Sequence, residues 1–245
     1  MRTGNPVLRD STFSARQAAG GQAAMTITGT VNKTFVMAVL LLISAGWVWS
    51  HTMTEGGLAA MTPWMIGGAI AGLVLVLVSV FKPAWSPVTA PLYALAEGLF
   101  VGGISALLEM QFPGLVLQAV GLTFATLVAL LVAYRSGLIK VTQNFRLGVV
   151  AATGGIFLVY MASWIMGFFG IQMPYLHESG MVGIGISLFI VVVAALNLVL
   201  DFDFIERGAE QGAPRYMEWV GALGLMVTLV WLYIEMLRLL AKLRE

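Results

Sequence analysis

The sequence predicts an all-helical membrane protein with seven transmembrane spans and a polar N-terminal tail. Of its 245 residues, 59% are hydrophobic and only 10% are charged, and the mean hydropathy is +0.92. A soluble domain carries about a quarter charged residues. Apolar stretches close to the roughly 20 residues that cross a bilayer recur along the chain. The composition and this recurrence together predict a polytopic helix bundle.

The hydropathy pattern divides the chain into two parts. Residues 1–33 are polar and rich in Gly, Ala and Thr, which predicts a flexible cytoplasmic tail with no removable signal peptide. Residues 34–245 are predicted to form the bundle. Breakers such as QFPG and QMPYLHESG separate its apolar stretches. The predicted spans are 34–50, 64–81, 88–108, 114–134, 147–170, 181–203 and 216–240.

Basic residues lie mainly on one predicted side of the membrane. Ten of the 13 Lys and Arg residues fall in the tail and in the second, fourth and sixth loops. The other three, Arg238, Lys242 and Arg244, lie at the C-terminal end. Because cytoplasmic loops are enriched in Lys and Arg, the N-terminus is predicted inside and the C-terminus outside. The stretch LDFDFIERG then lies at the cytoplasmic end of the sixth span.

The rare residues exclude several kinds of site. The chain has no cysteine, which excludes disulfides, thiol catalysis and cysteine metal sites. Its two histidines, His51 and His177, fall in predicted loops, which argues against an intramembrane haem or serine protease. A net charge of +1 gives no sign of the basic surface that a nucleic-acid-binding protein carries. We therefore expect no enzymatic activity, no cofactor and no nucleic-acid partner.

Small residues recur every four positions in the third predicted span and in the second. Such stripes let helix backbones approach closely inside lipid. They predict a tight bundle and carry no information on a substrate. The residues are Ala94, Gly98, Gly102 and Ala106, with Gly68 and Gly72.

Glu97 lies near the middle of the third predicted span, roughly 14 Å deep at the helical rise. A charge at that depth costs about 3 kcal/mol or more, so the side chain is expected to face protein. Two interpretations stay open. Glu97 is either a hydrogen-bonded contact between helices or a group that responds to protons or cations.

Asp201 and Asp203 are two residues apart, which is about 200° on a helix, so they point to nearly opposite sides. Asp201 shares a face with Asn197 and is the predicted inward group. Asp203 can pair with Arg207 at i+4, which predicts a solvated role at the helix end.

The last predicted span carries Glu218 near its inner end and Glu235 near its outer end. Local salt bridges explain both acids, because Arg215 precedes Glu218 by three residues and Arg238 follows Glu235 by three. Depth in a straight helix would instead place Glu218 beside Asp201.

Three stretches together resemble bacterial members of the Bax inhibitor (TMBIM) family: PLYALAEGLFVGGISALLE, LNLVLDFDFIERG and APRYMEWVGALGLMVTLVWLYIEMLRLL. The resemblance implies a bacterial inner-membrane protein with the last helix at the centre of the bundle. It also implies a pH-sensitive calcium leak, gated by a carboxylate on helix six paired with one on helix seven. Asp201 matches the helix-six acid, and Glu235, in LYIE, matches the helix-seven acid.

The partner of Asp201 stays open between Glu235, which the resemblance favours, Glu218, which depth favours, and neither acid. In the third case Arg207 or Arg215 would satisfy it. The predicted function is a pH-sensitive cation leak or transporter in the bilayer, with Ca²⁺ and H⁺ as transported or sensed ions. Ca²⁺ takes six to eight oxygen ligands, so Asp201 is a candidate calcium contact, although no firm metal site is predicted. The alternative is a non-conducting scaffold or a regulator of membrane-protein quality control.

Overall fold

The computed structural model describes residues 24–54, 57–170 and 180–245 and confirms seven helices long and apolar enough to cross a membrane. The candidate spans run from 21 to 30 residues, so each covers the roughly 30 Å of a bilayer core at the helical rise. The protein is therefore a multi-pass membrane protein. The helices are α2 (Ile27–Thr52), α3 (Gly57–Phe81), α4 (Ser86–Gln111), α5 (Leu115–Arg135), α6 (Gln143–Phe168), α7 (Met181–Glu210) and α8 (Met217–Arg244).

Most helices extend beyond the predicted spans, because hydropathy finds only their lipid-facing parts. The first helix begins at Ile27, inside the predicted tail, where the Thr26 hydroxyl accepts a hydrogen bond from the Gly29 N–H at 2.9 Å and caps the helix. Pro63 lies within α3, just before the predicted start of that span at residue 64. His51 is in the last turn of α2 and not in a loop, whereas His177 lies outside the described residues.

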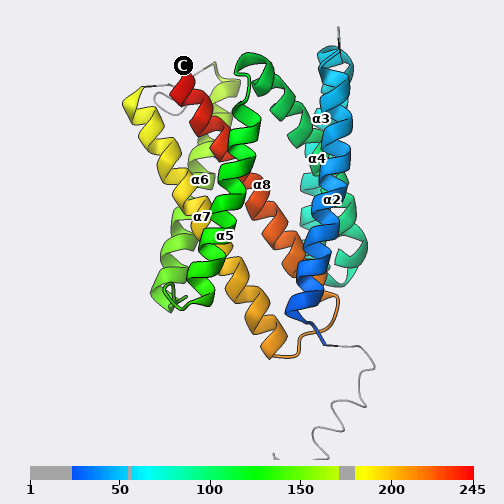
Figure 1. The fold of residues 1–245 in the computed structure, drawn as a ribbon, viewed down its shortest axis with the longest axis vertical. Helices are drawn as coiled ribbons and strands as arrows, with labels where there is room; N and C mark the ends of the chain where they lie inside the picture. Colours follow the sequence, from blue (N-terminus) through cyan, green and yellow to red (C-terminus); the bar gives the residue numbers. More distant parts are fainter. Residues whose placement is uncertain (1–23, 55–56, 171–179) are drawn as a thin grey trace, which may run out of the picture.

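The last helix occupies the centre of the bundle, as the resemblance implies. Figure 1 shows α8 running obliquely between α2–α4 on one side and α5–α7 on the other, and it packs against α2, α4, α5 and α7. Its first half shares a buried cluster with α2 and α4 that includes Met226 and Tyr93. Its second half shares another with α5 and α7 that includes Leu237 and Leu198. The two halves of the molecule therefore meet on one helix.

Glycines let α4 approach α2 and α3 closely. A methyl group on Gly98 would overlap the Ser44 hydroxyl of α2, and one on Gly102 would lie 2.6 Å from Ala45 Cα. The packing role predicted for this stripe therefore agrees with the structure. Helix α6 is the opposite case, since its apolar window is the least buried of the seven.

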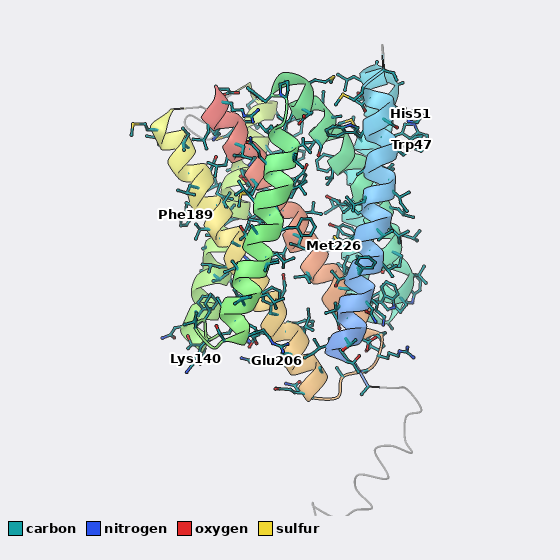
Figure 2. The ribbon with its side chains drawn as sticks, viewed as in Figure 1. Trp47, His51, Lys140, Phe189, Glu206 and Met226 are labelled. Carbon is teal, nitrogen blue, oxygen red and sulfur yellow. The ribbon has the colours of Figure 1, made fainter. Side chains whose placement is uncertain are left out.

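The two ends of the bundle differ in charge. We call "basic end" the end that holds the start of α2 and the connections 82–85, 136–142 and 211–216. In Figure 2, Lys140 and Glu206 lie at this end, Trp47 and His51 lie at the other, and Met226 lies between them. The basic end carries Lys33, Lys82, Arg135, Lys140, Arg146, Arg207 and Arg215.

Candidate functional site

Asp203 is buried and doubly paired, not solvated as its place near a helix end suggested. Its side chain accepts from Arg207 Nε at 2.9 Å, within α7, and from Arg146 Nη2 of α6 at 2.6 Å. Only 6% of the residue is exposed. The i+4 pairing with Arg207 is thus present, but a second arginine from another helix completes it. This residue joins α6 to α7 at the basic end.

Asp201 points the other way, toward α8. Its Oδ1 lies 3.7 Å from the place that a Cβ on Gly224 would take, and its carboxylate is hydrogen-bonded by the side chain of Thr228. Its Oδ2 is buried and has no hydrogen-bond partner among the described residues. Asp201 is therefore a carboxylate on the central helix interface with one oxygen left unsatisfied.

Asn197 does not join Asp201 in a common polar site. Its Nδ2 donates to Thr153 Oγ1 of α6 and to the Val193 carbonyl, both at 2.8 Å. The amide therefore turns toward α6, although one helical turn separates it from Asp201. Spacing predicts that Asn197 and Asp201 share one face of α7, but Asn197 meets α6 and Asp201 meets α8.

Neither acid of α8 contacts Asp201. Glu218 accepts two hydrogen bonds from Thr26 and forms an ion pair with Lys33 of α2. These contacts replace the predicted salt bridge between Glu218 and Arg215. Glu235 accepts from Arg238 and from the Tyr160 hydroxyl of α6, each at 3.0 Å. Both carboxylates are therefore satisfied by other groups.

Glu97 lies against α3. Its Oε2 would be 2.7 Å from a Cβ placed on Gly72, so the absence of a side chain at that glycine makes room for the carboxylate. Tyr93, one turn before Glu97 on α4, is buried in the cluster that α4 shares with α8. Among the described residues Glu97 has no hydrogen bond or ion pair. It is a second carboxylate in the interior of the bundle without a fixed partner among these residues.

These two carboxylates have few other possible metal ligands around them in the described part of the chain. Within the described part of the chain, no three His, Cys, Asp or Glu side chains gather closely enough to hold an ion. A Ca²⁺ ion needs six to eight oxygens, and Asp201 with Thr228 supplies only a fraction of them.

Sequence comparison places the chain in a family. The model of the family described as Bax inhibitor 1 like matches residues 5–245, which is nearly the whole chain. The protein belongs to the Bax inhibitor 1-like family. No curated protein and no solved structure matches it significantly. The family resemblance of the sequence is therefore confirmed.

The contacts in this family member that sequence reasoning missed all join distant segments. Arg146 and Asp203 are 57 positions apart, Tyr160 and Glu235 are 75 apart, and Lys33 and Glu218 are 185 apart. Local spacing carries no signal for such pairs. The only hint was that each missed partner is a polar residue in or beside an apolar span. Further contacts of this kind are Tyr134 with Glu206, Ser105 with Tyr233, and Lys242 with the Gly183 carbonyl.

Proposed function

We propose that this protein is a pH-sensitive cation leak channel or transporter that conducts Ca²⁺, with Asp201 as the group that exchanges protons and cations. The family membership supports the proposal. The observation that carries it is the Asp201 carboxylate, which lies against the central helix with one buried oxygen that no donor in the described part of the chain satisfies.

Physical chemistry gives this oxygen two natural partners. A buried charge without a partner is strongly unfavourable, so Asp201 is stabilised either by a proton or by a passing cation. Protons and cations then compete for the same carboxylate, and the flux depends on pH. Glu97 is the second candidate on this pathway, since it makes no hydrogen bond or ion pair with residues 24–54, 57–170 or 180–245. A pairing of Asp201 with an acid of α8 takes no part in this proposal, because Glu218 pairs with Lys33 and Glu235 pairs with Arg238.

We further propose that the basic end faces the cytoplasm of a bacterial cell and that the protein lies in the inner membrane. The excess of Lys and Arg at this end supports that orientation. Asp201 would then be reached from the cytoplasmic half of the membrane.

A non-conducting scaffold, with a role in membrane-protein quality control, is the competing function. The observation that favours it is that Asp203, Glu218 and Glu235 all fasten one helix to another. In this case the ion pairs serve only to hold the bundle together. No catalytic role is proposed for either case.

The test is ion flux through purified protein in liposomes. Ca²⁺, K⁺ and H⁺ fluxes are followed between about pH 6 and 8, the range in which a carboxylate that exchanges protons with a cation could titrate. The variant is Asp201→Asn, which keeps the shape of the side chain but cannot release a proton. The matched control is Glu210→Gln, because Glu210 is an exposed carboxylate at the end of α7.

The proposal expects the wild type to conduct Ca²⁺ with a strong pH dependence and Asp201→Asn to lose that dependence. Glu210→Gln should behave as the wild type. An unchanged pH profile in Asp201→Asn would remove Asp201 from the mechanism. No flux at any pH, from protein shown to be folded, would favour the scaffold. Glu97→Gln in the same assay tells whether the second carboxylate belongs to the pathway.

A further inference from the structure

The segment that precedes α2 runs along the connection between α7 and α8 at the basic end. The Met25 N–H donates to the Ala213 carbonyl at 2.7 Å, and Ala24 forms an isolated antiparallel bridge with Pro214. The Met25 side chain is buried. Residues 24–26 are thus held by the backbone of the connection that leads into the central helix.

The same segment supplies the partners of Glu218, the first acid of α8. The Thr26 N–H and the Thr26 hydroxyl both donate to Glu218 Oε1 at 2.9 Å, and Lys33 Nζ pairs with Oε2. Lys33 Nζ also lies 5.5 Å from the ring centre of Trp219. Glu218 is only 3% exposed, so its charge depends on these donors. A buried carboxylate that loses its partners is strongly destabilised.

Two glycines make this contact close. A Cβ on Gly29 would lie 2.5 Å from Glu218 Oε2, so the carboxylate would have to move away from its present position. One turn further along α8, a Cβ on Gly221 would lie 3.0 Å from Ile205 Cγ1 of α7 and 3.2 Å from Thr30 Cγ2 of α2. The start of α8 is therefore clamped between α2 and α7.

The clamped end of α8 leads directly to the Asp201 site. Gly224 and Thr228, which face Asp201, lie within three turns of Glu218, about 15 Å at the helical rise. A helix is stiff over this length. Any displacement of the start of α8 therefore moves the surface that covers Asp201.

We propose that residues 24–33 and Glu218 form a latch that holds the start of α8 in place, and that opening the latch exposes Asp201 to solution at the basic end. The claim that the latch gates ion flow rests on the proposed function, because it requires that ions bind at Asp201. The claim that the latch controls the exposure of Asp201 does not rest on that function, because exposure can be measured without any ion flux.

The exposure test uses a single reporter cysteine, since the chain has no cysteine of its own. Gly224→Cys places the thiol beside Asp201, and the site accepts a Cβ because its nearest atom is Asp201 Oδ1 at 3.7 Å. Purified protein in detergent is treated with a charged, water-soluble thiol reagent, and the labelling rate is followed. Gly29→Ala opens the latch by steric overlap with Glu218, and Glu218→Gln opens it by removing the charge.

Gly46→Ala is the matched control, because Gly46 lies on the same helix and a Cβ there meets nothing within 4 Å. We expect Gly29→Ala to raise the labelling rate about tenfold, the effect of weakening one charged contact. Glu218→Gln should give a smaller increase, since its amide oxygen still accepts from Thr26, and Gly46→Ala should give none. Unchanged labelling in both latch variants, with protein that elutes as a folded monodisperse species, would overturn the latch.

A disulfide tests the opposite direction. Residues in an antiparallel bridge have Cα atoms about 4.5–5.5 Å apart, which is within the range of a disulfide. The double variant Ala24→Cys with Pro214→Cys should lock the latch on oxidation, lower the liposome Ca²⁺ flux, and recover it on reduction. The single variant Ala24→Cys should not respond.

The two assays separate the latch from the proposed function. If no variant conducts, the proposed function fails, and the labelling rates still decide the latch. If the wild type conducts and the oxidised lock leaves the flux unchanged, the latch is not a gate. Increased labelling in the latch variants together with a reversible block by the lock would establish it.

Discussion

The carboxylates that pair with other groups at the basic end and those that face the interior of the bundle differ in their partners. At the basic end, Asp203 pairs with two arginines, Glu218 with a lysine and a threonine, and Glu206 with a tyrosine hydroxyl. In the interior of the bundle, Asp201, only two residues before Asp203, keeps one unpartnered oxygen and Glu97 makes no hydrogen bond with the described residues. Carboxylates of one sequence thus differ in whether basic or hydroxyl groups of other helices satisfy them, and those at the basic end fasten one helix to another.

The difference follows from where long basic side chains can stay charged. Lys and Arg near a helix end reach water with their charged groups, whereas in the hydrocarbon they cannot. Both arginines of Asp203 are 47% exposed along their side chains, so they bridge water and the buried acid. An acid that faces the interior is paired with neither arginine, as Asp201, which points toward α8, meets the side chain of Thr228.

The largest expected effect compares the two neighbouring aspartates by stability. Asp203→Asn should lower the free energy of unfolding by about 2 kcal/mol, because two charged hydrogen bonds weaken and the arginines are half exposed. Asp201→Asn should change it by less than about 0.5 kcal/mol or raise it, since a poorly satisfied charge is removed. Denaturant titration in micelles measures both, and a greater loss in Asp201→Asn would contradict the comparison.

A smaller change in stability is expected at Glu235, the buried acid near the opposite end of the bundle that Tyr160 and Arg238 satisfy. Tyr160→Phe removes the hydroxyl that donates to Glu235 and accepts from Arg238, while the ion pair of those two residues stays. We expect a loss of about 1 kcal/mol in the same titration, the typical value of one hydrogen bond. Tyr216→Phe is the control, since its hydroxyl makes no hydrogen bond in the described part of the chain. An equal loss in both variants would mean that Glu235 does not need the tyrosine.

The smallest effect tests whether Asn197 belongs with α6 and not with Asp201. A double-mutant cycle of Asn197→Ala and Thr153→Val should give a coupling energy of about 0.6 kcal/mol, as measured for polar contacts between membrane helices. A cycle of Asn197→Ala with Asp201→Asn should give none. Coupling to Asp201 alone would return Asn197 to the carboxylate site.

The sequence predicted the seven spans, because a long apolar run has few alternatives to a membrane helix. It predicted the local ion pairs of Asp203 with Arg207 and of Glu235 with Arg238, because helical spacing brings i+3 and i+4 neighbours together whatever surrounds them. It also predicted the opposed directions of Asp201 and Asp203, which depend on the helical repeat alone. Helix ends were less accurate, since caps such as Thr26 lie outside the apolar run.

Only the tertiary structure decided which helix each polar face meets. Periodicity fixes the direction of a side chain about its own axis, but the packing of seven helices chooses its neighbour. Asn197 and Asp201, one turn apart, therefore face different helices. Glu218 meets Lys33 at a separation of 185 positions, and no local pattern records that distance. Helix α8 crosses between the two halves of the bundle, so it brings Glu218 to Lys33 at one point and covers Asp201 at another. One oxygen of Asp201 is left there without a hydrogen-bond partner among the described residues.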